Sequence, residues 1–494
     1  MNVLFVTSLC DIRSPRKPLY GPESIQFGIS YISSYLKEHG HKTRLIVLSR
    51  MSGRSNDTFI KEALRDLHPG VVLFTAVSTE YPFIAAKARY IRQHYPGVLL
   101  VVGGPHASLD PEGVIQDDFD AVCVGEGELP VLELVTRLGR GDVPRGIENF
   151  WLKTREGIER NPVRPFLEDL DMLPFPDRAM WDDWMEDPSR GRHSVLLGRG
   201  CPFQCTYCCN HALKNLASGP YVRFRSAENI LAEINEMERK YPRSRDIFLE
   251  VETVGARMDF ALGLCDKLEQ LVRTRSSPLT FGVNLRVTPN VDYERLFDAF
   301  RRGNIRYITV GLESGSERIR RDVLKRFYAN DDILHAVKMA RKYGIKVGFQ
   351  NMLGLPSETL RDFRETIKMN RACRPAYVFI SIFYPYPGTD LFLLCRERGL
   401  LRGELDTRME RSKAVLDLPG FSKREIQREW IWFEYNVYRG SRPLWKLLSR
   451  VLVSWLKTNY FVLRVYRRIT CTPGFKQLMR LSERTLWRNE GAGP

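Results

Sequence analysis

The stretch Leu197-Gly198-Arg199-Gly200-Cys201-Pro202-Phe203-Gln204-Cys205-Thr206-Tyr207-Cys208-Cys209-Asn210 decides the fold of the second half of this chain. Its first three cysteines have a C-x3-C-x2-C spacing, and two glycines interrupt the apolar run before them. The pattern predicts a strand that ends in a tight loop carrying three thiols. Three thiolates on one short loop can reach a single metal centre. In a four-iron, four-sulfur cluster they would leave one iron open for another ligand.

Zinc is the alternative that the cysteines alone leave open. Cys201, Cys205 and Cys208 could be structural zinc ligands, with Cys209 or His211 as the fourth. Zinc sites of this kind usually use paired C-x2-C units, and no second pair follows in the sequence. The spacing therefore favours the iron–sulfur cluster. Disulfides are not expected, because the chain has no secretory signature.

The loop resembles the signature of the radical S-adenosylmethionine (radical SAM) enzymes. Tyr207, the aromatic residue just before the third cysteine, matches that signature as well. The resemblance implies that Cys201, Cys205 and Cys208 ligate a [4Fe-4S] cluster. The open iron would hold the amino and carboxylate groups of S-adenosylmethionine, whose reductive cleavage yields a 5′-deoxyadenosyl radical. An external electron donor of the flavodoxin or ferredoxin type is then required.

Composition places the chain among ordinary globular proteins. Its 494 residues suggest two to four domains at about 100–200 residues each. Only ten cysteines, scattered outside the cysteine loop, no signal-peptide pattern and no apolar run of membrane-spanning length predict a cytoplasmic protein in a reducing compartment. The net charge is +16, and residues 396–494 contribute 21 Lys/Arg against 10 Asp/Glu, so most of the basic excess lies in the tail.

Residues 1–145 alternate between apolar runs and amphipathic segments. Strands are predicted at 2–7, 43–48, 71–75, 98–102 and 120–124, and helices at 25–39, 56–67, 83–94 and 129–138. This alternation predicts an α/β fold with a Rossmann-like, doubly wound parallel sheet. Such sheets bind ligands beyond the carboxyl ends of their strands.

Two glycine-rich turns follow predicted strands in this region, Gly103-Gly104-Pro105-His106 and Gly125-Glu126-Gly127-Glu128. Glycines let a backbone approach a bulky ligand closely. Neither turn is a GxGxxG or phosphate-binding motif, so a dinucleotide is not favoured.

The same layout resembles the cobalamin-binding domain that precedes the radical SAM barrel in one large subfamily. That resemblance makes Gly103, Gly104, Gly125 and Glu126 cobalamin contacts. The D-x-H-x-x-G motif is missing, so no histidine from it would ligate the lower face of cobalt. His106 is a candidate for a lower-face or tail contact, although a hydrogen-bonded loop histidine is the favoured interpretation.

Residues 146–193 contain a predicted hairpin followed by a proline-rich connector, which marks a domain boundary. Residues 194–390 alternate again. Strands are predicted at 194–197, 246–252, 279–286, 307–313, 346–353 and 377–383, and helices at 227–240, 260–274, 293–301, 331–343 and 360–373. Six strands with their helices fit the partial (β/α)6 barrel of radical SAM enzymes. The chemistry is expected at the carboxyl ends of the strands.

Polar residues recur at those strand ends. They are Glu250 and Glu252, Asn284 and Arg286, Glu313 and Ser314, and Gln350. Residues two apart on a strand share a face, so the first two pairs could both point into the barrel. Carboxylates or amides for an ammonium group and a guanidinium for a carboxylate suit a zwitterion. By resemblance these residues are S-adenosylmethionine contacts. For each one alone a structural salt bridge is as good an explanation.

The tail, residues 391–494, loses the alternation. Helices are predicted at 423–439, 443–466 and 474–487, rich in tryptophan and in basic residues. The favoured interpretation is a helical cap over the barrel mouth with a basic outer face. A peripheral helix on an anionic membrane comes second, because Trp, Leu and Lys/Arg are typical of interfacial helices. Nucleic-acid binding is third, since no recognised module is present.

Together these features predict a cobalamin-dependent radical SAM enzyme, with methyl transfer to an unactivated carbon of a small-molecule or lipid-like substrate as the leading hypothesis. A radical cyclase or rearrangement enzyme with the same cofactors is the alternative. RNA modification, as in radical SAM methylthiotransferases, is less favoured because the N-terminal region has only Cys10 and Cys123 to hold a second cluster. A non-enzymatic metal-binding module is the weakest hypothesis.

Overall fold

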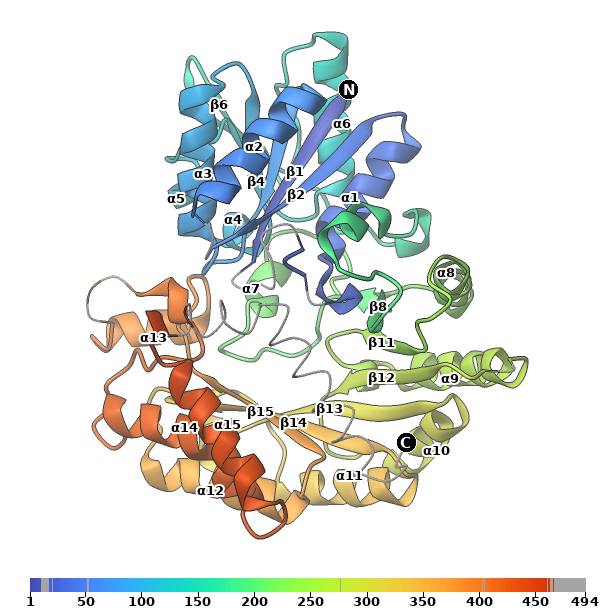
Figure 1. Cartoon of the computed structure of the whole chain (residues 1–494), viewed down its shortest axis with the longest axis vertical. Helices are drawn as coiled ribbons and strands as arrows, with labels where there is room; N and C mark the ends of the chain where they lie inside the picture. The colour runs from blue at the N-terminus through green and yellow to red at the C-terminus, as the bar shows by residue number, and fades with distance from the viewer. Residues whose placement is uncertain are drawn as a thin grey trace.

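The computed structural model describes residues 1–9, 17–19, 21–50, 53–275, 277–401, 403, 405–459, 461–462 and 465. Two sheets of mainly parallel strands dominate these residues, and Figure 1 shows them one above the other with α7 (Asn210–Lys214) between them. The α/β class predicted from the alternation of strands and helices is confirmed. The helix predicted at 474–487 lies outside the described residues.

The first sheet has seven strands in the order β2-β1-β3-β4-β5-β6-β7. The strands are β1 (Asn2–Leu9), β2 (Lys42–Ser49), β3 (Val71–Thr75), β4 (Leu99–Gly103), β5 (Ala121–Cys123), β6 (Phe150–Thr154) and β7 (Gly157–Arg160). The first five run parallel, while β6 pairs antiparallel with β5. The predicted hairpin therefore extends the first sheet.

Helices cover both faces of this sheet, because its strands are apolar on both sides. On β1, Leu4 and Val6 pack under α2 (Gly53–Leu67) and α3 (Tyr81–His94). Val3 and Phe5 point the other way, towards α1 (Phe27–Glu38) and α6 (Glu128–Arg140). Two short helices, α4 (Pro105–Leu109) and α5 (Pro111–Val114), follow β4 directly.

The second sheet has six parallel strands in the order β15-β14-β13-β12-β11-β8. The strands are β8 (Arg192–Leu196), β11 (Asp246–Glu250), β12 (Thr280–Leu285), β13 (Ile305–Glu313), β14 (Lys346–Leu353) and β15 (Tyr377–Ile382). The helices are α8 (Ala227–Lys240), α9 (Met258–Arg273), α10 (Tyr293–Arg302), α11 (Asn330–Lys342) and α12 (Leu360–Cys373). The predicted partial barrel is confirmed, with its first strand beginning two residues earlier than expected.

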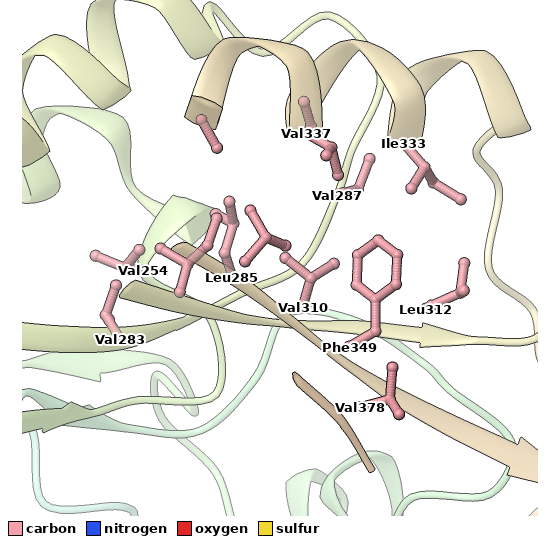
Figure 2. Close-up of a cluster of buried hydrophobic side chains, with 14 of the residues drawn as sticks. Val254, Val283, Leu285, Val287, Val310, Leu312, Ile333, Val337, Phe349 and Val378 are labelled. Atoms are coloured by element: carbon pink, nitrogen blue, oxygen red, sulfur yellow. The ribbon is translucent and has the colours of Figure 1, made fainter. Parts of the chain in front are cut away.

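Alternation along these strands separates a core face from an inner face. Val283 and Leu285 of β12 and Phe349 of β14 point towards the helices, where they meet side chains such as Ile333 of α11 (Figure 2). The residues between them, including Asn284 and Gln350, therefore face the inside of the partial barrel. The core thus holds the strands in register and leaves the inner face available for polar groups.

The C-terminal region comprises α13 (Asp390–Glu397), α14 (Lys423–Tyr438) and α15 (Leu444–Leu456). A cap over the barrel mouth was predicted, but α14 packs against α12 and β15 on the helix-covered side of the sheet. The Trp430 indole N–H donates to the Ile380 carbonyl at 3.2 Å. For α14 the prediction is wrong, because the apolar stripe of this helix, which includes Ile426 and Phe433, completes the barrel core. No helix in the described ranges is long and apolar enough to span a membrane.

A buried carboxylate fixes the turn after β14. Glu358 is 1% exposed, and its Oε2 accepts the backbone N–H groups of Gly354 and Leu355 at 2.6 and 3.1 Å. Burial raises the pKa of Glu358 from 4.5 to about 8. Because the folded state holds this proton more tightly than the unfolded state does, folding is favoured below the unfolded pKa and loses that stabilisation as pH rises towards 8.

Replacing Glu358→Gln should therefore flatten the pH dependence of stability. We expect the wild-type melting temperature to fall more than that of the variant between about pH 5.5 and about pH 8.5, because about 1.4 kcal/mol accompanies each pKa unit. Thermal unfolding of both proteins at each pH measures this. The exposed Glu397→Gln substitution is the control and should behave like the wild type. Parallel pH profiles for wild type and Glu358→Gln would contradict the assignment.

Candidate functional site

A cavity of about 680 Å³ opens where the carboxyl ends of both sheets meet. From the first sheet it is lined by Thr75, Gly103, Gly104, Gly125 and Glu126. From the half of the chain that carries the second sheet it is lined by Gly198, Arg199, Gly200, Tyr221, Glu250, Glu252 and Asn284. Its volume lies in the range of small-molecule and cofactor sites, roughly 300–1,000 Å³. Seven of the residues predicted from sequence to contact cofactors thus share one cavity.

Gly103, Gly104 and Gly125 line this cavity and are called the glycine shelf below. Gly104 has φ = +97°, and a Cβ there would lie 2.9 Å from the Ala76 carbonyl oxygen and the Thr75 hydroxyl. A side chain would therefore be both strained and crowded at this position. The lining also contains the apolar residues Leu73, Phe74 and Val101. Open backbone groups and apolar side chains can therefore both contact a bulky ligand in this cavity.

Ion pairs beside the cavity join the half of the chain that carries the first sheet to the half that carries the second. Arg199 donates to Glu126 at 3.0 Å and also pairs with Glu128, which is only 4% exposed. Arg223 reaches the other Glu126 oxygen at 2.9 Å. Burial alone would raise the pKa of Glu126, but Arg199 and Arg223 lower it below its ordinary value. Glu126 therefore lines the cavity as a paired carboxylate that links the two halves of the chain.

The cysteine loop adjoins the part of the cavity lining that comes from the second half of the chain. Gly200 has φ = +85°, and a Cβ there would sit 2.1 Å from the Tyr221 carbonyl oxygen, so glycine lets the loop run against β10 (Arg223–Phe224). The Tyr221 hydroxyl donates to Asn210 at 2.6 Å, and the Asn210 amide lies 3.6 Å from Cys208 Sγ. Cavity wall and third cysteine are thus joined through one asparagine.

The surroundings of the cysteine thiols suit ligands of an iron–sulfur cluster. Arg286 Nη1 lies 2.8 Å from Cys205 Sγ, and a neighbouring guanidinium complements a thiolate ligand. A hydrogen bond from the Cys209 thiol lowers the pKa of Cys208 to about 6, whereas burial raises that of Cys201 to about 11. Among the described residues, no three His, Cys, Asp or Glu side chains gather closely enough for a single metal ion.

Behind the loop, Tyr207 belongs to a buried polar network. Its hydroxyl donates to Glu313 at 3.1 Å and accepts from Arg326 Nη1 at 2.9 Å. Arg326 also donates to Glu313 at 3.4 Å and lies 4.0 Å from Cys205 Sγ. Burial raises the pKa of Glu313, while Arg326 opposes that shift. These contacts fix the orientation of Tyr207 and hold Arg326 next to Cys205.

Six of the predicted residues do not line the cavity. Tyr207, Arg286 and Glu313 lie around the cysteine loop as described above, and the other three lie elsewhere. His106 is buried, the centre of its ring lies 4.3 Å from that of Tyr81 with the two rings tilted by 50°, and burial lowers its pKa. Ser314 is fully buried and bonded to Thr366 of α12. Gln350 is exposed on the inner face of β14, two strands away from Asn284. The side chains of His106 and Ser314 are used in packing, so the structure does not support the cofactor contacts predicted for them.

Sequence patterns also missed residues that the structure brings to the site. Arg326 lies in a loop without a recognisable motif, 13 residues after Glu313. Arg199 could have been identified from the sequence, because a charged residue between two glycines directly follows an apolar strand. The acidic turn Glu126-Gly127-Glu128 is the matching signal in the first domain.

Comparisons with known proteins agree with this arrangement. The Radical SAM superfamily matches residues 195–369, and the B12 binding domain matches residues 20–135. An uncharacterized methyltransferase of Pyrococcus horikoshii is 27% identical over 87% of this chain and 90% of its own length. An anaerobic magnesium-protoporphyrin IX monomethyl ester cyclase of Rubrivivax gelatinosus is 25% identical over 74% of this chain and 65% of its own length.

A solved structure shares the fold across both sheets. The radical S-adenosylmethionine methyltransferase TsrM of Kitasatospora setae, solved with cobalamin and a [4Fe-4S] cluster, aligns with a TM-score of 0.64 at 16% identity. The alignment covers 92% of this chain and 90% of TsrM. The radical SAM domain implies a [4Fe-4S] cluster and S-adenosylmethionine, and the B12-binding domain implies cobalamin. The chain is a radical SAM protein with a B12-binding domain in front of its radical SAM domain.

Proposed function

We propose that this protein is a cobalamin-dependent radical SAM methyltransferase that methylates an unactivated carbon. One observation carries the proposal, namely that the strand ends of both domains line a single cavity. When bound, the cluster with S-adenosylmethionine supplies a hydrogen-abstracting radical, and cobalamin supplies a methyl group. A shared cavity would let both groups act on one substrate carbon.

The chain's own residues would hold these groups in place. Cys201, Cys205 and Cys208 would ligate the cluster, and Arg286 beside Cys205 would complement the charge of that thiolate. Glu250 and Glu252, with Asn284, would receive the polar end of S-adenosylmethionine on the inner face of the barrel. Gly103, Gly104 and Gly125 would let the corrin ring approach the backbone. The interdomain ion pairs would keep the two walls at a fixed separation.

A second candidate is a radical cyclase or rearrangement enzyme. It is favoured by the similarity to the anaerobic magnesium-protoporphyrin cyclase. The two candidates differ in the number of product carbons. Cell extract incubated with the active protein and methyl-deuterated S-adenosylmethionine should yield a metabolite that has gained one labelled methyl group, which is absent with the Cys208→Ala variant. A new product with an unchanged carbon count would contradict methyl transfer and favour the cyclase.

The cluster ligands can be tested one by one. Replacing Cys201, Cys205 or Cys208 with alanine should abolish iron–sulfur absorption after anaerobic reconstitution, because three ligands are the minimum for a cluster with one open iron. Cys209→Ala is the matched control and should keep a full four-iron cluster. Full iron content in any of the first three variants would contradict the assignment. Metal loss in Cys209→Ala would instead support the four-ligand zinc site.

Cobalamin binding can be tested on the glycine shelf. A Cβ at Gly103 would make only ordinary contacts, 3.6 Å from the Cys123 Cβ, so Gly103→Leu should fold while occupying cavity volume. We expect its dissociation constant for hydroxocobalamin to rise about tenfold or more, since about 1.4 kcal/mol corresponds to tenfold. Iron–sulfur content should be unchanged. Gly139→Leu, on the exposed side of α6 with no atom within 4 Å of its Cβ, is the control. Unchanged cobalamin affinity in Gly103→Leu would place cobalamin elsewhere.

We further propose that a flavodoxin- or ferredoxin-type protein supplies the electron and that α15 gives the protein a peripheral contact with anionic membranes. The membrane proposal rests on one face of α15, where Leu444, Trp445, Leu448, Leu452 and Trp455 are exposed by 44–60%. Arg450 lies away from this face and pairs with Glu434 of α14 at 3.8 Å, so the basic residues of α15 lie on its other side. Trp, Leu and basic side chains on one helix are the composition of interfacial helices. A lipid-like substrate in the membrane would then lie near the protein.

Vesicle sedimentation tests the membrane contact. The wild type should sediment with phosphatidylglycerol vesicles, and Trp445→Ala/Trp455→Ala should lose most of that binding, because two interfacial anchors are removed. Trp432→Ala, a partly exposed tryptophan on α14, is the control and should bind like the wild type. Retained binding by the double variant would remove the membrane contact from the proposed function.

A further inference from the structure

A second hollow, of about 740 Å³, lies along the cysteine loop. It is distinct from the cavity of about 680 Å³ described above, which we call the cofactor cavity. Pro202, Phe203 and Gln204, the three residues between the first two cysteines, line it together with Thr206. The cofactor cavity is instead lined by Gly198 to Gly200 and by Tyr221 and Glu252. The loop therefore forms a wall of both spaces. We call the second one the cluster-side groove.

The cluster-side groove carries positive charge and an exposed aromatic ring. Lys214 of α7 and Lys325 are exposed on its rim, and Arg286 lies deeper. Its lining contains one carboxylate, Asp390, which lies 2.9 Å from His211 Nε2. Phe327 is 65% exposed at the same place. Basic rims around an exposed aromatic residue are typical of a surface that meets an acidic protein.

The groove also has a short connection to a cluster ligand. The Arg286 guanidinium lies 3.7 Å from the centre of the Phe203 ring, and its Nη1 is 2.8 Å from Cys205 Sγ. Both side chains line the groove. A single layer of side chains therefore separates a molecule in the groove from a thiol of the signature loop. Electron-transfer rates fall steeply with distance, so a thin wall is what an electron-donor site needs.

We propose that the cluster-side groove docks a small acidic protein that carries a single electron. The proposal rests on the function proposed above, which needs an external reductant. The reduced carrier loses one electron and the enzyme's [4Fe-4S] centre gains it, with no bond made or broken. Carboxylates on the carrier would meet Lys214 and Lys325, and this attraction would speed encounter at low ionic strength. The substrate side of the loop stays free during reduction.

Charge reversal at the rim tests the proposal. The variant Lys214→Glu/Lys325→Glu is compared with Lys61→Glu/Arg140→Glu, which makes the same charge change on exposed positions of the first domain. Reduced acidic ferredoxin is mixed anaerobically with each reconstituted protein, and bleaching of the cluster absorption is followed by stopped flow. Dithionite, a small reductant that needs no docking surface, is used in a parallel series. Ferredoxin binding is measured by calorimetry.

The groove variant should be reduced by ferredoxin at least about tenfold more slowly than wild type at low salt and bind it more weakly, with the difference shrinking as salt rises. The control pair and all dithionite rates should match wild type. Equal ferredoxin rates in the two charge-reversal variants, or a wild type that dithionite reduces and ferredoxin does not, would overturn the docking proposal while leaving the proposed function intact. A wild type without any iron–sulfur spectrum would contradict both.

Discussion

Two arginines of the radical SAM domain hold two glutamates of the B12-binding domain, and the position of the cofactor cavity depends on these contacts. Arg199 and Arg223 both pair with Glu126, and Arg199 also reaches Glu128. The groups are largely buried, so removing one partner would leave an uncompensated charge, at a cost of about 3–5 kcal/mol in comparable cases. The same residues line the cavity wall or adjoin it. The contact that joins the domains therefore also sets the distance between their strand ends.

The rest of the site follows from the direction of the strands. Parallel strands bring their carboxyl ends to one edge of a sheet, and residues at those ends of both sheets line the same cavity. One edge presents glycine backbone, and the other presents carboxylates and an amide. The cysteine loop closes the second edge, and the network of Tyr207, Glu313 and Arg326 supports it from behind. A rigid frame of this kind suits radical chemistry, which requires fixed positions and exclusion of solvent.

Sequence patterns predicted the parts of this arrangement that are local. Period-two alternation placed Glu250, Glu252 and Asn284 on the inner face of the barrel, and glycine-rich turns marked the shelf at Gly103, Gly104 and Gly125. The cysteine spacing predicted the loop. Local patterns failed where a side chain had a competing partner from a distant segment. The His106 ring packs at a tilt against Tyr81, and Ser314 hydrogen-bonds to Thr366, 52 residues later.

Long-range pairing also explains the residues that were missed or assigned incompletely. Glu126 was predicted as a cofactor contact, but its partners Arg199 and Arg223 lie 73 and 97 residues away. Arg326 reaches Tyr207 across 119 residues. The tail was assigned to the barrel mouth because its apolar stripe gave no indication of which surface it covers. Only the folded chain shows that α14 completes the core beside α12.

The central claim is that one interdomain cavity brings both cofactors to one substrate. An anaerobic crystal structure of the protein loaded with the cluster, S-adenosylmethionine and cobalamin tests it most directly. The account predicts the corrin ring against Gly103, Gly104 and Gly125, with the open iron of the cluster and S-adenosylmethionine facing it from the side of Glu252 and Asn284. Cobalamin bound outside this cavity, or S-adenosylmethionine bound away from the cysteine loop, would contradict it.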